Sequence, residues 1–198
     1  MVRVVRMTTL LALALLACSC ATDTVAVRAD PAGADSAAIL QDLSGQSHRP
    51  MLVGDKGAAV LFFVLSDCPI CNEYAPEINR IVSDYQKRAV AAYVVHVDRD
   101  VSIEELRKHA NEYGYTCPVL VDSDRSLAKR VGVGVAPEAA VIGPGGKVQY
   151  VGRIDDRYAS LGKQRIAATT HEVRDAIDAV LSGKSVEVKR VKAIGCAL

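Results

Sequence analysis

An apolar run that ends in two closely spaced cysteines is the feature that most constrains the fold of this chain. Residues 58–65 read AAVLFFVL, which is typical of a strand buried on both faces. Cys68-Pro69-Ile70-Cys71 follows, and apolar residues then recur at helical spacing from Tyr74 to Tyr85. The two cysteines therefore lie where a buried strand passes into a helix. Unpartnered backbone N–H groups and the positive end of the helix dipole stabilise a thiolate at such a position.

Strand and helix patterns alternate along the rest of the chain. Residues 90–97 form a second apolar run, and Ser102 and Glu105 make a capping box for a helix that Gly114 ends. The segments expected next are a strand at 118–121, a short helix at 126–131, a hairpin of 139–142 with 147–151, and a helix that starts with the box Thr169–Glu172 and ends at Gly183. This order predicts an α/β fold with a mixed central sheet flanked by helices.

Four motifs carry a resemblance to a known family. They are Ser66–Cys71, Tyr74–Ile78, Pro118–Asp122 and Gly134–Glu138. With them, residues 37–154 resemble the redoxin branch of the thioredoxin-fold proteins, the extracytoplasmic TlpA-like and peroxiredoxin-like group. The resemblance implies a thioredoxin-like three-layer sandwich over residues 37–183, followed by a C-terminal tail at 184–198. It also implies a thiol–disulfide oxidoreductase that acts on protein thiols or disulfides in the cell envelope, together with a redox partner protein.

The N-terminus has the pattern of an export signal. Two arginines precede the apolar run LLALALLA at residues 10–17, and Leu15-Leu16-Ala17-Cys18 resembles the bacterial lipobox. This predicts a lipoprotein signal peptide at 1–17, lipidation of Cys18 and a tether at 18–36. The alternative is an ordinary secretory signal cleaved near Ala21. Either form exports the chain, and the first makes it a periplasmic, membrane-anchored lipoprotein.

Cys68 and Cys71 are the predicted catalytic pair. Cys68 precedes the helix and is the candidate nucleophile, and Pro69 suits the first helical position. Cys71 would resolve the mixed disulfide and form a redox disulfide with Cys68. The alternatives are a static disulfide or half of a zinc site. Because no second CxxC pair follows, the sequence predicts no metal and no cofactor.

The resemblance places a second part of the site at Ala136 and Pro137. In thioredoxin-like proteins a cis-proline faces the cysteines, and the backbone before it pairs with the bound substrate chain. Ala136-Pro137 occupies that position, so the resemblance implies a cis peptide bond there. The alternative is a trans proline that opens a strand.

Two residues depart from the thioredoxin pattern. Asp67 stands where a tryptophan usually precedes the first cysteine, and Phe62 stands where a buried acid is usual. A carboxylate beside the thiol disfavours its ionisation. Because Phe62 replaces the buried acid, proton handling at Cys71 must differ. His96 and Asp98 lie near the end of the second strand, and we expect them to be strand-end, solvated residues.

Two other activities compete with the oxidoreductase. A peroxiredoxin-like peroxidase needs a hydroxyl three residues before its reactive cysteine, and Leu65 holds that position before Cys68. A Sco-like copper-binding or delivery protein would combine the cysteine pair with a distant histidine. His171 is the candidate, although the cysteine spacing differs by one residue and His171 is expected to be a surface residue.

The remaining cysteines and charges have weaker patterns. If Cys18 carries lipid, five cysteines remain, and an odd number cannot pair completely within one chain. Cys117 is expected to pack as a small hydrophobe. Cys196 is expected to be a spare or packing thiol, with a third resolving thiol or a partner-binding thiol as the alternative. The charged residues of the stretch 153–157 are expected to form structural ion pairs. The formal net charge of +1 gives no support for nucleic-acid binding.

Overall fold

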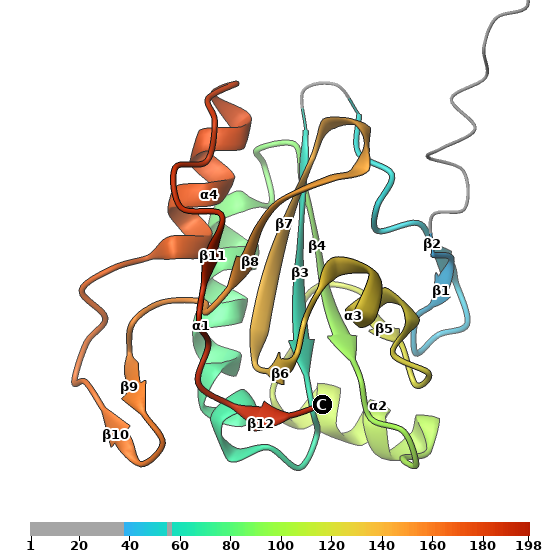
Figure 1. Ribbon diagram of the computed structural model, residues 1–198. Helices are drawn as coiled ribbons and strands as arrows, with labels where there is room; N and C mark the ends of the chain where they lie inside the picture. The colour runs from blue at the N-terminus through green and yellow to red at the C-terminus, as the bar shows by residue number, and fades with distance from the viewer. Residues whose placement is uncertain (1–37, 55–56) are drawn as a thin grey trace, which may run out of the picture. The chain divides into compact units, whose positions relative to one another are not determined.

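A six-stranded mixed sheet forms the centre of the protein (Figure 1). The computed structural model describes residues 38–54 and 57–198. In spatial order the strands are β11 (Arg190–Val191), β8 (Lys147–Gly152), β7 (Glu138–Gly143), β3 (Ala58–Val64), β4 (Val90–His96) and β5 (Val119–Val121). The strands β3, β4 and β5 are parallel, β7 runs antiparallel to both β3 and β8, and β11 is parallel to β8. The predicted mixed sheet is confirmed, including the hairpin of β7 and β8.

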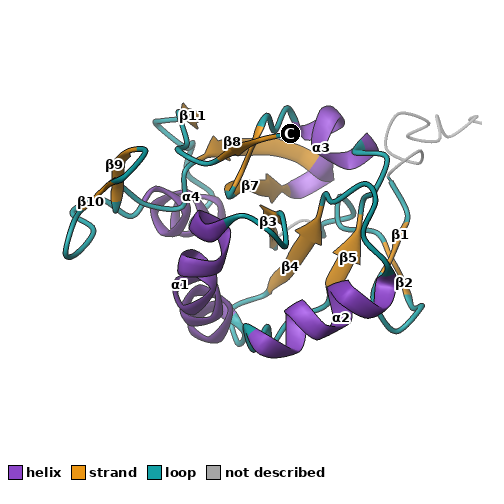
Figure 2. Cartoon of the chain, turned by 90° about the horizontal axis from the view of Figure 1, so that it is seen from below, coloured by secondary structure: helices purple, strands orange, loops and turns teal. Residues whose placement is uncertain are grey.

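Helices cover both faces of this sheet. They are α1 (Pro69–Tyr85), α2 (Ile103–Glu112), α3 (Ser126–Val131) and α4 (Glu172–Leu181). Figure 2 shows α1, α2 and α4 on one side of the sheet and α3 on the other. The three layers agree with the predicted α/β sandwich. Among the described residues, no helix has both the length and the apolar character needed to cross a bilayer.

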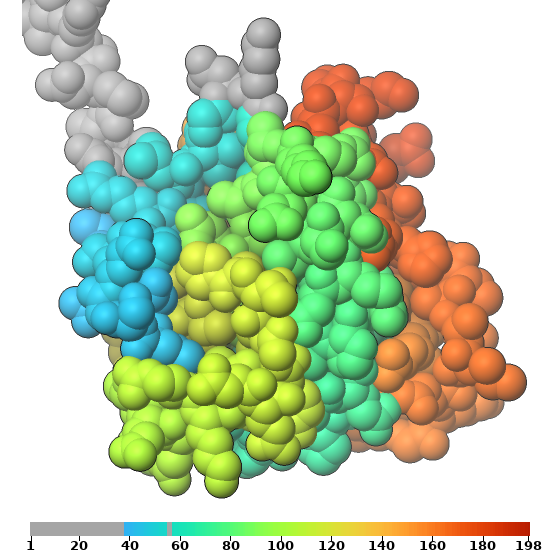
Figure 3. Space-filling view, turned by 180° about the vertical axis from the view of Figure 1, so that it is seen from behind, coloured from blue at the N-terminus to red at the C-terminus, as the bar shows by residue number. Residues whose placement is uncertain are grey.

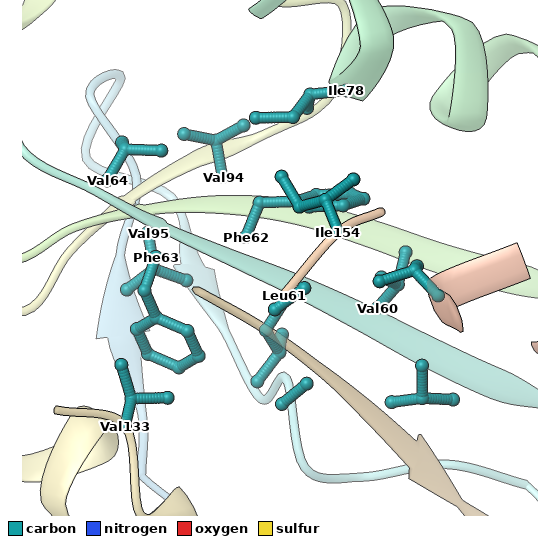
Figure 4. Packing of buried hydrophobic residues seen from close by; sticks show 14 of the residues in the cluster. Val60, Leu61, Phe62, Phe63, Val64, Ile78, Val94, Val95, Val133 and Ile154 are labelled. Carbon is teal, nitrogen blue, oxygen red and sulfur yellow. The ribbon is translucent and has the colours of Figure 1, made fainter. Parts of the chain in front are cut away.

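The central strand β3 is the middle of the core. All seven of its residues are buried, because β4 and β7 pair with its two edges and helices cover its two faces. Figure 4 shows Phe62 on the same side of the strand as Ile78 of α1, whereas Phe63 points to the other side, toward Val133. This two-sided burial explains why the sequence of β3 is apolar throughout and does not alternate.

The predicted capping box forms at α2 but not at α4. Ser102 and Glu105 form the predicted box at α2: each side chain accepts the backbone N–H of the other residue, at 3.2 and 3.0 Å. The predicted box at α4 is wrong. The helix begins at Glu172, and the backbone N–H groups of Thr169 and Thr170 donate to Asp156 instead. These two residues are held by the preceding loop and do not extend the helix.

Short strand pairs lie around the central sheet. They are β1 (Leu40–Gln41) with β2 (Ser47–His48), β9 (Tyr158–Ser160) with β10 (Lys163–Gln164), and β6 (Val135–Ala136) with β12 (Cys196–Ala197). A single 3-10 turn, η1 (Pro144–Gly146), links β7 to β8. Figure 3 shows the molecule from behind, with the blue segment of β1 and β2 against the yellow-green surface around α2. Arg107 of α2 donates to the Leu43 carbonyl at 2.7 Å in this region.

The residues after α4 return to the sheet. They add β11 beside β8 and then carry β12 to the lower end of the sheet, next to β6 (Figure 1). The boundary at residue 183 between domain and tail stays a prediction. The predicted signal peptide and tether, with Cys18, lie outside the described residues.

Candidate active site

Cys68 lies at the junction between β3 and α1. It is the N-cap residue of α1 with extended backbone angles, Pro69 takes the first helical position, and the Cys68 carbonyl accepts the Asn72 N–H at 3.1 Å. The sulfur is therefore next to the first turn, where N–H groups have no partner within the helix. Such a position favours the thiolate over the thiol. The side chain is almost fully buried, with 1% of the residue exposed.

Cys68 is bonded to Cys196. The two residues are 128 positions apart in the sequence, and their Cα atoms are 6.3 Å apart. The spacing of the motif predicts a disulfide with Cys71, but in this structure Cys71 is a free, buried thiol. The physical reason for the difference is the course of the tail, since β12 brings Cys196 to the edge of β6, directly across from Cys68. The exchange role of Cys71 stays a prediction.

Cys71 lies deeper in the helix, in the core. It has no exposed surface, and its sulfur accepts a hydrogen bond from the Leu65 N–H at 3.5 Å. Burial raises the pKa of this thiol to about 12, and the nearby carboxylates of Asp98 and Asp67 act in the same direction. Cys71 is therefore a neutral thiol near neutral pH, and it must lose its proton when it attacks a disulfide.

Ala136 and Pro137 face Cys68 as the resemblance implies. The peptide bond between them is cis. The Ala136 carbonyl oxygen lies 3.4 Å from the Cys68 sulfur, and Ala136 is fully buried. Ala136 is the last residue of β6, Pro137 follows it, and β12 pairs with β6 in a two-stranded sheet. The substrate-binding role of Ala136 and Pro137 stays a prediction, but the structure shows that this edge accepts an extended chain.

His96 and Asp98 lie near the end of β4 as expected, but they are buried, so the expectation that they are solvated is wrong. The exposed fraction is 0% for His96 and 5% for Asp98. The Asp98 carboxylate accepts the backbone N–H of Ser66 at 3.0 Å and its hydroxyl at 2.7 Å, and it lies 2.8 Å from Nδ1 of His96. The register of β3 with β4 explains this burial. Val64 pairs with His96, so Ser66 and Asp98 come together just beyond the strand ends.

The carboxylate of Asp98 is near the free thiol. The adjacent amides of Leu65 and Ser66 donate to the Cys71 sulfur and to Asp98 respectively. Burial alone would raise the pKa of Asp98, but hydrogen bonds from His96 and Ser66 outweigh it and leave the pKa below its usual value. An ionised carboxylate therefore lies behind Cys71, although Phe62 occupies the position of the usual buried acid.

The other predicted residues have structural surroundings. Cys117 is free and partly buried against the core, as expected, and burial raises the pKa of its thiol to about 11. His171 is exposed and is the N-cap residue of α4. Among the described residues, no three or more His, Cys, Asp and Glu side chains are placed together so that they could hold a metal ion.

The charged stretch 153–157 forms the expected ion pairs at three of its four charged positions. The pairs are Arg153 with Glu172, Asp156 with Arg165, and Arg157 with Glu73. The fourth residue, Asp155, accepts the Tyr74 hydroxyl of α1 at 2.7 Å instead. These contacts connect the loop after β8 to α1 and α4.

A sheet of this order, with a cysteine at the start of the first long helix and a cis-proline facing it, defines a thioredoxin-like redox fold. The model of the AhpC/TSA family matches residues 37–151. Because the match covers more than half of the chain, the chain belongs to the AhpC/TSA family.

Two curated relatives are similar in sequence. The thiol-disulfide oxidoreductase YkuV of Bacillus subtilis (strain 168) is 31% identical over 87 residues, which are 43% of this chain and 58% of YkuV. The thiol-disulfide oxidoreductase ResA of Geobacillus thermodenitrificans (strain NG80-2) is 30% identical over 114 residues, 57% of this chain and 63% of ResA. The matches thus span about three-fifths of the length of these relatives.

Two solved structures are also similar to this chain. An uncharacterised conserved protein from Geobacillus kaustophilus has a TM-score of 0.71 at 27% identity, over 81% of this chain and 88% of that chain. MTB DsbF, solved in mixed oxidised and reduced forms, has a TM-score of 0.51 at 26% identity, over 60% and 84%. The first likeness covers more of the chain than the family match does.

Proposed function

We propose that this chain is a thiol–disulfide oxidoreductase with Cys68 as its nucleophile. The observation that carries the proposal is the position of the Cys68 sulfur, at the start of α1 and 3.4 Å from the carbonyl that precedes cis-Pro137. The helix start favours the thiolate, and the backbone of β6 offers an edge to an extended substrate. Membership of the AhpC/TSA family and the names of the two relatives support the same chemistry.

The proposed exchange needs two sulfurs of the chain. The Cys68 thiolate attacks one sulfur of a substrate disulfide, whose S–S bond breaks, and the other substrate sulfur leaves as a thiolate. Cys71 then attacks the Cys68 sulfur, loses its proton and releases the second substrate thiolate. The substrate gains two electrons, and the Cys68–Cys71 pair loses them as it forms a disulfide. The reverse sequence oxidises a substrate dithiol with the same atoms.

Substitutions of these cysteines test this assignment. Cys68→Ser abolishes reduction of a peptide disulfide by the pre-reduced protein, because no other sulfur lies at the helix start. Cys71→Ser, made together with Cys196→Ser so that the tail thiol cannot resolve the intermediate, accumulates mixed disulfides with the peptide at Cys68, which mass spectrometry of the alkylated protein detects. Cys117→Ser is the matched control and keeps the rate of the unchanged protein. If Cys68→Ser retains the rate, the proposal is wrong.

The same Cys71→Ser, Cys196→Ser protein identifies natural substrates. We propose that these are protein thiols or disulfides, together with a redox partner protein, and that nucleic acid is not a partner. The backbone edge of β6, which β12 occupies in this structure, suits a peptide chain and would not select a small disulfide. Proteins captured through Cys68 are released by reductant and identified, whereas the same protein with Cys68→Ser added captures none. Equal capture by this variant contradicts this part of the proposal.

We further propose that the chain is exported to the cell envelope and anchored through lipid on Cys18. The support is the charged start, the short apolar run and the lipobox-like Leu15–Cys18. In a bacterial host given a labelled fatty acid, the full-length protein takes up label and sediments with membranes. Cys18→Ser loses both properties, and Cys20→Ser, a cysteine two residues further on, keeps them. Label that persists in Cys18→Ser contradicts the lipid anchor.

A further inference from the structure

The C-terminal segment occupies the edge of β6 that the proposed function assigns to a substrate. Within this antiparallel pair, Cys196 is opposite Ala136 and Ala197 is opposite Val135. The N–H of Leu198 also donates to the Gly134 carbonyl at 3.2 Å, so backbone contacts continue to the last residue. The cysteine of this strand is bonded to Cys68. The tail thus has the arrangement that a substrate chain would have in a mixed disulfide.

A glycine permits this close approach. A Cβ atom added to Gly195 would lie 2.1 Å from the Ala136 carbonyl oxygen and 3.0 Å from the Pro137 nitrogen. The first distance is far shorter than any van der Waals contact, and both neighbours are backbone atoms that cannot rotate away. Any larger residue at position 195 therefore pushes the tail off β6.

The base of the tail is fixed independently of the disulfide. Strand β11 pairs with β8, and the guanidinium of Arg190 donates to the Gly132 carbonyl at 2.9 Å and lies 3.8 Å from the Glu138 carboxylate. Only residues 192–195 separate β11 from β12. A short connection of this kind holds Cys196 near Cys68 even when the two sulfurs are not bonded.

We propose that residues 195–198 are an internal substrate of this protein, and that Cys196 is a third redox thiol that alternates with Cys71 as the partner of Cys68. With the Cys68–Cys196 bond formed, the β6 edge is closed to other chains. With the Cys68–Cys71 bond formed, or with all three thiols reduced, the tail can leave the edge and a substrate can bind. This inference rests on the proposed function, since it assigns a competitor to the same site.

The two oxidised forms interconvert without an external oxidant. The Cys196 thiolate attacks the Cys68 sulfur of the Cys68–Cys71 disulfide, that bond breaks, and the Cys68–Cys196 bond forms. Cys71 leaves as a thiolate and takes up one proton, which balances the proton that Cys196 gave up. The number of electrons in the protein does not change. In this structure Cys71 is a free, buried thiol, which is the state that this step would leave.

The first test maps the disulfide of the full-length protein. The protein is oxidised in a glutathione redox buffer, quenched with acid, alkylated and digested for mass spectrometry. We expect a linked peptide pair that contains Cys68 and Cys196, and its yield falls in Gly195→Val, which keeps all the sulfurs. If the only linked pair is Cys68 with Cys71, the inference is wrong.

The second test measures how fast the pre-reduced protein reduces a peptide disulfide. A short tether gives the tail an effective concentration on the order of 1 mM, so with peptide at about 0.1 mM we expect displacement of the tail to raise the rate up to about tenfold. Gly195→Val becomes faster, whereas Cys117→Ser does not change. A slower Cys196→Ser would make this thiol a required resolving group, and an unchanged rate for Gly195→Val would leave the edge unoccupied. Either result overturns the inference.

The outcomes separate this inference from the proposed function. If Cys68→Ser still reduces the peptide, the proposed function fails, whatever the tail does. If Cys68→Ser is inactive while Gly195→Val matches the unchanged protein, the oxidoreductase stands and only the internal substrate is refuted.

Discussion

A buried histidine that contacts α1 makes the stability of this protein depend on pH. His109 of α2 is only 7% exposed, its Nε2 lies 2.9 Å from Oδ1 of Asn72, and its Nδ1 has no hydrogen-bond partner. The rings of His96, Tyr113 and Tyr115 surround it. Burial and, to a smaller extent, the neighbouring His96 lower the pKa of His109 from 6.5 to about 4, although the Asp98 carboxylate acts in the opposite direction. The folded protein therefore resists protonation that the unfolded chain accepts.

The size of the effect follows from linkage. A group with a lowered folded-state pKa contributes stability above its unfolded pKa, and that stability is lost as the pH falls toward the folded value. For His109 the window runs from pH 6.5 down to about 4. The full shift corresponds to about 3 kcal/mol, of which about 2 kcal/mol is lost between roughly pH 7 and 5.

Urea unfolding measures this loss directly. The chain has no tryptophan, so circular dichroism is the signal, and the disulfide state is kept the same in all samples. Between pH 7 and 5 the unchanged protein should lose about 2 kcal/mol more than His109→Gln does. The exposed His171 supplies the control, since His171→Gln should lose as much as the unchanged protein. Equal losses for the unchanged protein and His109→Gln would refute the argument.

Two further substitutions test the roles of two buried carboxylates, Asp98 and Asp122. Asp98→Asn removes a charge that raises the pKa of Cys71, so alkylation of this thiol at alkaline pH becomes faster. Asp100→Asn changes an exposed carboxylate and has no effect on this rate. An unchanged rate for Asp98→Asn contradicts the effect of Asp98 on Cys71. Asp122 accepts two N–H groups from the first turn of α3, at 2.8 and 3.1 Å, so Asp122→Ala should cost about 2–3 kcal/mol in urea unfolding; a loss below about 0.5 kcal/mol contradicts this.

Much of the fold could be predicted from local patterns. The run 58–65 predicts a strand because it is buried on both faces, and the Ser102 box predicts the start of α2 because both of its bonds are local. The family resemblance implies the cis peptide bond between Ala136 and Pro137, which these two residues alone do not determine. These features depend on residues a few positions apart or on an established fold.

The parts that sequence could not supply depend on distant neighbours. Cys196 meets Cys68 only because two-residue strands at β11 and β12 turn the tail along the sheet, and strands that short leave no periodic pattern. Asp98 is polar and near a strand end, which usually indicates exposure. Its burial follows from the partner residue Ser66 on the neighbouring strand. One signal is present in the sequence: if Cys18 carries lipid, five of the six cysteines remain, and an odd number leaves the pairing open.

Cys68, Cys71 and Cys196 differ in exposure, and this difference determines how an external thiol reduces the Cys68–Cys196 disulfide. Cys71 is fully buried and Cys68 is 1% exposed, whereas Cys196 is partly exposed on the tail. An incoming thiolate therefore reaches Cys196 first. Attack there expels Cys68, whose thiolate is favoured at the helix start and is the better leaving group.

This order of attack has a measurable product. In Cys71→Ser, a brief exposure to glutathione followed by acid and alkylation should place glutathione on Cys196 and the alkyl label on Cys68. Glutathione found on Cys68 would contradict the order of attack, because the tail sulfur would then be the leaving group. The expected order regenerates the nucleophile in the same step that frees the tail, so a reducing thiol both opens the β6 edge and supplies the thiolate that attacks the substrate.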